Sequence, residues 1–476
     1  MTEYPISRIF PPLNHDCSLY ILDILDTPSL LSVASTSRIA MTTARRFLVQ
    51  DVVLQADVER YSAFCEFVLL HDLTRHVRYL TVGCELVKAS GHDKAFFSSL
   101  AEILEKAENL RGFVFEGCIC RFPNAAQIAS ALVDRPVSEL SLCMGLLLFR
   151  DLRPIYGLRV LSVWEWACDL SGSALSNSSN LSNILSNNAH TLESLTMPRL
   201  VSRIFPAIPF PHIHTLRVTE LSTTAKRLAR ASPHLQSLFD INFSNYFINS
   251  RVQTQSTLWP SLTTVTGDLL VIMALARRHA LQRVKLRHTG WLSVDWLRDE
   301  RFCVEFLDAI RDCPLEVLSL DVRVYALQEC GDVRFPLLPR LASSAPNLKC
   351  LAFNISTMPK ITECLQTMTS PHIHALGNLR SLRYATLFMR DDINSDPLPK
   401  RTGLSPEQER DAIVRHWFTM IPSLEYLELE VKISEWPVTW WRRTDGHLRE
   451  ESGGAGGAMV QISKEEGKAA RERYWQ

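Results

Sequence analysis

Two copies of the tetrapeptide Pro-His-Ile-His are the first candidates for chemistry. They place His212 beside His214 and His372 beside His374, each pair two residues apart. Residues two apart on a strand point to the same side, so each pair could bind a transition metal. No Asp, Glu or Cys at suitable spacing completes either site, and a repeated segment that leads into a strand explains the match better. We therefore expect no metal and no other cofactor.

Motifs for catalysis or nucleotide binding are missing or incomplete. The sequence has no Gly-x-Ser-x-Gly, no Ser-x-x-Lys in a suitable context and no Cys with a paired His. The glycine run at 453–457 lacks the Lys-Ser/Thr of a phosphate-binding loop, and packing explains Cys118-x-Cys120. The aromatic and basic residues at 440–443 could stack on nucleic acid, but they stand alone in a neutral chain. We expect a protein that is not an enzyme and does not bind nucleic acid.

The remaining candidates are outward-facing side chains on predicted strands. Trp and Arg anchor protein interfaces more often than most residue types. Trp164 and Trp166 are therefore the first candidates, although a loop that covers them would explain these two indoles equally well. The predicted contacts to a partner protein are Trp164, Trp166, Arg217, Lys285, Arg287 and Phe388. Further outward positions are Thr81, Ser141, Ser319, Asp321, Asn354, Glu428 and Glu430.

A repeated unit, clearest at residues 314–320, positions these side chains. Its Leu-x-x-Leu-x-Leu spacing predicts a short strand with Leu318 and Leu320 on one side and Ser319 on the other. Apolar residues at helical intervals over 302–310 precede it, so the unit is a helix followed by a strand. The pattern recurs at spacings of roughly 20 to 50 residues, which is typical of stacked repeats. The other copies are at 77–82, 110–115, 137–142, 158–163, 192–197, 213–218, 235–238, 281–286, 348–353, 382–387 and 424–429.

The predicted fold class is α/β, with a solenoid of leucine-rich-repeat-like units over residues 56–432. Regular leucine-rich repeats are about 20 to 29 residues long and close on Asn or Cys, features that many units here lack. Residues 433–476 should form a C-terminal cap, with 435–441 folded over the open end, and a tail that is flexible or only marginally helical. The expected helices are 96–107, 125–132, 181–185, 224–231, 269–278, 304–311 and 407–418.

Residues 11–55 differ in texture and predict a small three-helix unit. A turn is expected at 26–28, after which Ser29 could cap the second helix, and a third helix over 37–48 leads to the strand-like 52–54. A unit of this size buries little apolar surface by itself, so it needs a partner. The apolar stripe of the first helix consists of Leu19, Ile21, Leu22, Ile24 and Leu25.

This unit resembles an F-box, as found in the large fungal F-box families. The shared pattern is a Leu-Pro-type start, an Ile-Leu helix, Leu-x-x-Leu with a later Leu-Leu, and a Val-Ser-Lys/Arg-type segment at 33–38. The opening dipeptide is Pro-Leu instead of Leu-Pro, and Phe47 is nearest to the usual late Trp. The adaptor-binding residues that the resemblance implies are Pro12, Leu13, Ile21, Leu22, Leu25, Pro28, Leu30, Leu31 and Val33.

The resemblance implies a subunit of a cullin-type ubiquitin ligase. In such a subunit the F-box binds a Skp-family linker protein, and the repeats bind a substrate protein. The alternative is a non-catalytic repeat scaffold in which residues 11–54 are only a helical cap, since every array needs its ends covered. The cap alone does not account for the spacing of Pro28, Leu30 and Leu31 after the Ile-Leu helix.

Composition narrows the class of partner. The 476 residues include 51 Lys and Arg against 51 Asp and Glu, so no global charge attracts nucleic acid or an anionic membrane. The 12 cysteines are scattered without a C-x-x-C, which favours buried free thiols in a reducing compartment over disulfides or metal sites. Residues 1–16 do not read as a signal peptide, and the apolar run 269–276 is much shorter than the roughly 20 residues that cross a bilayer. We expect a protein of the cytosol or nucleus without a membrane partner.

Overall fold

The computed structural model is an α/β protein, described here in two compact units. The units are residues 1–218 with 227–233, and residues 219–226 with 234–476. The described residues form 13 α-helices and 16 strands, and the order of the strands in the sheet is their order in the sequence. The described residues are 13–54, 58–83, 93–116, 125–133, 135–144, 155–165, 179–200, 209–221, 225–243, 258–287, 300–324, 337–357, 374–391, 406–431, 438–444 and 459–475.

Three short helices begin the first unit, as predicted. The helix starts are set by polar caps: the Asp26 carboxylate accepts a hydrogen bond from the Ser29 N–H (3.0 Å), and the Ser37 hydroxyl caps the third helix. The prediction that Ser29 caps the second helix is wrong, because this helix starts within the predicted turn and holds Pro28 in its first turn. The helices are α1 (His15–Ile24), α2 (Thr27–Thr36) and α3 (Arg38–Leu48).

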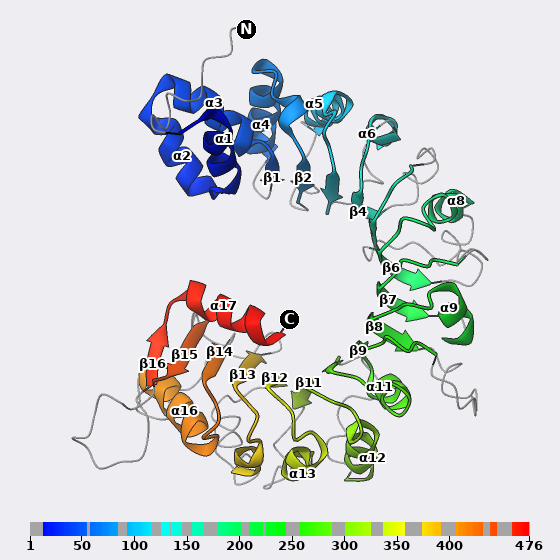
Figure 1. Cartoon of the computed structure of the whole chain (residues 1–476), viewed down its shortest axis with the longest axis vertical. Helices are drawn as coiled ribbons and strands as arrows, with labels where there is room; N and C mark the ends of the chain where they lie inside the picture. The colour runs from blue at the N-terminus through cyan, green and yellow to red at the C-terminus, as the bar shows by residue number, and fades with distance from the viewer. Residues whose placement is uncertain are drawn as a thin grey trace. The chain divides into compact units, whose positions relative to one another are not determined.

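Parallel strands alternate with helices through the rest of the first unit. Figure 1 shows the helices on one side of the strands. The elements are β1 (Asp51–Leu54), α4 (Val58–Leu70), η2 (Thr74–His76), β2 (Tyr79–Val82), α5 (Asp93–Lys106), β3 (Gly112–Phe115), α6 (Ala125–Val133), β4 (Glu139–Met144), β5 (Val160–Glu165), α8 (Ser179–Asn187) and β6 (Ser194–Leu200). The boundary between the units falls within β7 (Thr215–Leu221) and near α9 (Ala225–Ala231).

The second unit continues the same alternation and ends differently. Its last two strands pair antiparallel, β14 with β15 and β15 with β16. In Figure 1, α11, α12, α13 and α16 lie on one side of the strands and α17 lies on the other. The elements are β8 (Ser237–Phe243), β9 (Thr264–Gly267), α11 (Leu269–Ala276), β10 (Arg283–Leu286), α12 (Glu300–Ile310), β11 (Val317–Val324), α13 (Leu337–Ser344), β12 (Cys350–Thr357), η6 (Ala375–Asn378), β13 (Tyr384–Asp391), α16 (Pro406–Met420), β14 (Tyr426–Val431), β15 (Thr439–Arg443), β16 (Met459–Ile462) and α17 (Lys464–Trp475).

At most parallel strand starts, one backbone carbonyl accepts two hydrogen bonds from the neighbouring strand. The Arg78 carbonyl accepts hydrogen bonds from the N–H groups of both Arg111 and Gly112, at 2.7 and 3.0 Å. In the second unit the Lys349 carbonyl accepts in the same way from Arg383 and Tyr384. The same pair of bonds recurs at most of the parallel strand starts. Backbone hydrogen bonds therefore join each of these repeats to the next, in addition to the packing of the core.

The leucine spacing buries one side of every repeat strand. Leu318 and Leu320 of β11 are fully buried, and Phe306 and Ile310 of α12 pack with the core, as the periodicity predicts. Phe302, which the same stripe includes, is exposed, and Cys303 takes the buried position instead. All twelve segments with the leucine pattern contain strands, from β2 to β14.

The C-terminal segment corrects one prediction. Residues 464–475, expected to be flexible or only marginally helical, form α17, which packs against the sheet. The predicted fold-back segment ends in β15, which adds an antiparallel strand next to β14. Its small residues Gly467 and Ala470 allow the helix to pack closely on the sheet, a feature that apolar periodicity does not reveal.

Candidate protein-binding surfaces

The three N-terminal helices leave several large apolar side chains in solvent. Tyr20 and Ile24, one turn apart on α1, are 68% and 64% exposed, and Leu31 on α2 is 55% exposed. Met41 on α3 is exposed to a smaller extent. Adjacent residues on a helix differ by about 100° in direction, so the neighbour of Leu31, Leu30, is buried. These exposed apolar side chains are the candidates for contact with another protein.

The predicted adaptor-binding residues fall into three groups. Leu22 and Leu30 lie in the core of the unit and cannot contact a partner directly, which corrects their assignment. Leu31 and Pro28 are exposed, and Pro12 lies outside the described residues. The half-buried members are Leu13, Ile21, Leu25 and Val33. Sequence reasoning missed Tyr20, although its position four residues before Ile24 was a usable signal.

The strand face of the first unit is a second candidate surface. We use this name for Thr81, Val114, Ser141, Ser162 and Thr196, which are paired in register across β2 to β6. All five side chains are half-buried, whereas the alternate residues on these strands, beginning with Leu80, are buried on the helix side. The side chains are short, so this face can accept a partner without first moving a large group.

Four of the six predicted partner contacts lie on strands, in both units. Trp164 is in β5, paired with Cys143, but its side chain and Trp166 lie outside the described part of the chain. Arg217 is half-buried in β7, and so is Lys285 in β10. Arg287 follows β10 and is exposed, and half-buried Phe388 in β13 is paired with Asn354 and Glu430. Where they are described, Arg217, Lys285 and Phe388 alternate with buried residues, on the predicted side of their strands.

Two other predicted outward residues are buried. Ser319 in β11 and Glu428 in β14 do point away from the α12 and α16 side, because each alternates with buried leucines. Glu428 is covered by Arg471 of α17, which forms an ion pair with it. The sequence pattern gave the correct side, but it did not reveal that another helix lies there.

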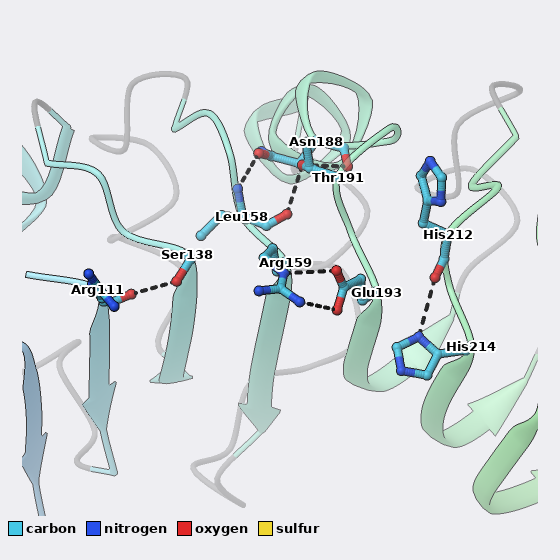
Figure 2. A network of polar contacts seen from close by, with 9 residues as sticks. All are labelled: Arg111, Ser138, Leu158, Arg159, Asn188, Thr191, Glu193, His212 and His214. Atoms are coloured by element: carbon cyan, nitrogen blue, oxygen red, sulfur yellow. Dashed lines mark hydrogen bonds and ion pairs between the residues drawn. The ribbon is translucent and has the colours of Figure 1, made fainter.

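A polar network at the strand starts of the first unit is structural (Figure 2). The buried Asn188 side chain accepts a hydrogen bond from the Leu158 N–H at 2.8 Å. It also donates to the carbonyls of Ile155 (2.7 Å) and Ile184 (2.8 Å). Beside it, the Thr191 hydroxyl donates to the Leu158 carbonyl at 2.8 Å. All three bonds join the Asn188 side chain to backbone groups, namely those of Ile155, Leu158 and Ile184. The network therefore connects two repeats.

An exposed ion pair extends this network toward solvent. Two guanidinium nitrogens of Arg159 donate to the two carboxylate oxygens of Glu193, at 2.8 and 2.9 Å (Figure 2). The hydrogen bond from Arg159 lowers the pKa of Glu193, so the carboxylate stays ionised. Water and salt screen a pair this exposed, so it fixes geometry more than stability.

The histidines do not assemble a metal site among the described residues. The Nδ1 atom of His214 lies 3.3 Å from the carbonyl of His212 (Figure 2). The ring of His374 meets the ring of His416 edge-on, with centroids 6.0 Å apart. Within the segments that the structure describes, no three His, Cys, Asp or Glu side chains come together as ligands would. His372 lies outside those segments.

Four of the five cysteines whose side chains are described are buried in the core. Cys65, Cys303, Cys313 and Cys350 are buried free thiols, as predicted, and burial raises the pKa of Cys65 to about 12. Such thiols are poor nucleophiles because the thiolate is the reactive form. Cys17 is a free thiol on the surface. Six other cysteines lie outside the described residues, and of Cys143 in β4 only the backbone is described.

Residues 440–443, the candidates for stacking on nucleic acid, make contacts within the protein. Trp440 packs against Gly467 of α17, and Arg442 forms an ion pair with Glu466 at 2.5 Å. The Arg443 guanidinium donates to the carbonyls that end α16 and precede β14, including that of Leu424 (3.0 Å). These contacts close the end of the second unit.

Comparison with known proteins adds no family assignment. No family model matches the sequence, and no curated protein matches it significantly. Among the helices in the described segments, none has the length and apolar character that a membrane crossing requires.

Proposed function

We propose that this chain is the substrate-recognition subunit of a cullin-based, F-box-type ubiquitin ligase. The N-terminal helices bind a Skp-family linker, and the following helix–strand units form a leucine-rich-repeat-like solenoid that binds the substrate protein. The chain itself supplies no catalytic residue and acts in the cytosol or nucleus. The observation that carries the proposal is the exposure of Tyr20, Ile24 and Leu31 on helices that also carry the F-box-like sequence pattern.

The burial pattern makes the adaptor test specific. Leu31→Asp changes an exposed side chain, so it should leave the fold intact and abolish capture of a Skp-family linker by the full chain. Leu30→Asp would be uninformative, because it places a charge in the core and unfolds the unit. Leu70→Asp is the matched control, since Leu70 is another exposed leucine, located on α4 outside the three helices. Equal capture by wild type and Leu31→Asp would refute the proposal.

One observation favours the alternative of a scaffold with a helical cap. The three helices contact the first helix–strand unit. Asp23 of α1 lies 3.5 Å from Arg78, which precedes β2, and the Arg45 guanidinium of α3 lies over the Phe67 ring of α4. If the helices are only a cap, the full chain binds no linker, and deletion of residues 1–50 exposes apolar surface and causes aggregation. Linker binding that is lost with Leu31→Asp decides between the two.

A further inference from the structure

The helix α17 lies on a surface that an array of this kind leaves open in the first unit. We call this surface the strand face of the second unit: Val317, Cys350, Tyr384 and Tyr426, paired in register across β11 to β14, with Glu428 two residues further along β14. Ala470, Tyr474 and Trp475 of α17 pack on it. Figure 1 shows α17 on the side of these strands opposite α12, α13 and α16. In the first unit the corresponding strand positions are not covered by a described helix.

The contacts of α17 follow one face of the helix. Gly467, Ala470, Arg471 and Tyr474 are spaced i, i+3, i+4 and i+7, which is the spacing of a helix bound in a groove. A side chain at Gly467 would collide with the Trp440 ring, so the helix must be small there. Ala470 is buried in the sheet contact.

Aromatic contacts define the far end of the helix. The Tyr474 ring stacks on Tyr384, with centroids 5.8 Å apart and an interplanar angle of 28°. Its hydroxyl donates to a carboxylate oxygen of Glu425 at 2.8 Å. The Tyr426 ring lies 6.1 Å from the Tyr474 ring and completes a three-tyrosine cluster. A bound helix thus needs an aromatic residue with a hydroxyl at this position.

Glu428 imposes a charge requirement on whatever lies there. Its side chain is fully buried and accepts hydrogen bonds from the Tyr384 hydroxyl (2.8 Å) and the Thr386 hydroxyl (3.3 Å). Arg471 supplies the positive charge, with its Nε atom 2.9 Å from a Glu428 oxygen. A buried carboxylate without a cation is strongly unfavourable, so a different occupant has to bring its own guanidinium or ammonium group.

The contact of α17 with this surface combines aromatic packing with an ion pair, and it is partly exposed. Only Gly467 and Ala470 of the helix are buried, and the Arg471 side chain is 44% exposed. By contrast, α12 buries Phe306, Leu307 and Ile310 and cannot leave without opening the core. Ion pairs in contact with water are weakened by salt and exchange readily. The helix can therefore detach while the repeats stay folded.

We propose that the strand face of the second unit is a recognition site for a helix that presents an Arg and, three residues later, a Tyr behind small residues, and that α17 is its built-in occupant. A partner helix with the same chemistry displaces α17 by pairing its Arg with Glu428 and its Tyr with Tyr384 and Glu425. That this partner is a ubiquitin-ligase substrate rests on the proposed function; the ability to bind such a helix does not.

A labelled peptide of residues 463–476 tests the site in the full chain. The double variant Arg471→Glu with Tyr474→Ala releases α17, so it should bind the peptide saturably in fluorescence anisotropy. Wild type should bind at least ten-fold more weakly, because its own helix is present at high effective concentration. Lys468→Glu with Glu472→Ala is the matched control: it changes two exposed residues of α17, leaves the helix in place and should bind as wild type does.

Two further measurements decide the outcome. A peptide with Arg471→Glu should not bind the released variant, and Glu428→Gln in that variant should weaken binding of the wild-type peptide at least ten-fold. In wild type, α17 amides should exchange with deuterium at least ten-fold faster than α12 amides, and faster again in 0.5 M NaCl. Failure of a folded double variant to bind, or protection of α17 equal to that of α12, would overturn the proposal. If the double variant misfolds, the wild-type exchange comparison alone decides. None of these readouts needs a Skp-family linker, so they stand or fall separately from the adaptor assay.

Discussion

Asn188 shows how one side chain joins two repeats. Its carboxamide is buried and bonded to three backbone groups, at residues 155, 158 and 184. Asn188→Ala leaves these buried groups without partners, so we expect the free energy of unfolding to fall by about 2 to 4 kcal/mol. Urea unfolding followed by circular dichroism measures this. Asn187→Ala, at the exposed neighbouring position, is the control and should change little.

A buried histidine predicts how stability depends on pH. Burial lowers the pKa of His279, which packs beside the Trp259 ring, below its ordinary value of 6.5. Above pH 6.5 the ring is neutral in both the folded and the unfolded state, so it adds no pH dependence. Below pH 6.5 the unfolded state takes up the proton first, so stability falls until the pH passes the lower pKa of the folded state.

Replacing this histidine should flatten the acid side of the stability curve. For His279→Gln we expect the slope between pH 6.5 and 5 to decrease by up to about 1.4 kcal/mol per pH unit, which is the contribution of one proton. Thermal or urea unfolding over a pH series measures the slope. His190→Gln, which changes an exposed histidine, is the control for the substitution itself. An unchanged slope in His279→Gln would mean that the ring protonates in the folded state.

At the level of single residues, sequence reasoning found the correct segment more often than the correct side chain. It placed Leu30 and Leu31 together in the adaptor surface, but only the helical phase decides that Leu31 is exposed and Leu30 buried. That phase depends on the helix start, which Asp26 sets and not the predicted Ser29. Glu428 was predicted to face outward and does, although α17 covers it.

The elements that were missed have weak apolar patterns for physical reasons. The strand β9 has a single apolar residue, Val265, so no alternation is visible. The helix α13 has Pro339 in its first turn, where the missing N–H would have no intrahelical partner anyway. The packing of α17 depends on small and charged residues, and hydrophobic periodicity does not detect such a face.

The contact between Gly467 and Trp440 gives a prediction for a whole element. Alanine favours a helix over glycine by about 1 kcal/mol, so local propensity alone says that Gly467→Ala stabilises α17. The added methyl group would meet the Trp440 ring, and we expect this collision to cost about 1 to 3 kcal/mol and to loosen the helix. Hydrogen exchange of α17 measures the change, and Lys468→Ala is the exposed control. Slower exchange in Gly467→Ala would contradict the packing described here.

For the whole molecule, the leucine spacing predicted most of the architecture because apolar residues two apart mark the buried side of each repeat strand. Parallel strands in sequence order follow from helix–strand units that bury their apolar faces against their neighbours. The antiparallel strands β15 and β16 and the helix α17 were beyond this reasoning, because they close the second unit and do not repeat.

The proposed function separates two binding activities along the chain, and this separation is testable. Ser162 lies within the in-register row of small side chains that forms the strand face of the first unit. Ser162→Arg adds a long charged side chain to this face without entering the core. We expect it to reduce capture of substrate proteins at least ten-fold, equivalent to about 1.4 kcal/mol, while linker binding is retained.

Leu31→Asp should give the opposite result: the same captured proteins, measured by quantitative mass spectrometry, without the linker. Asn183→Arg places the same new charge on the exposed surface of α8 and should change neither activity. If Ser162→Arg and Asn183→Arg capture the same proteins in the same amounts, the strand face of the first unit is not the substrate surface. If Leu31→Asp loses both activities, the N-terminal helices stabilise the repeats and the cap alternative gains its support.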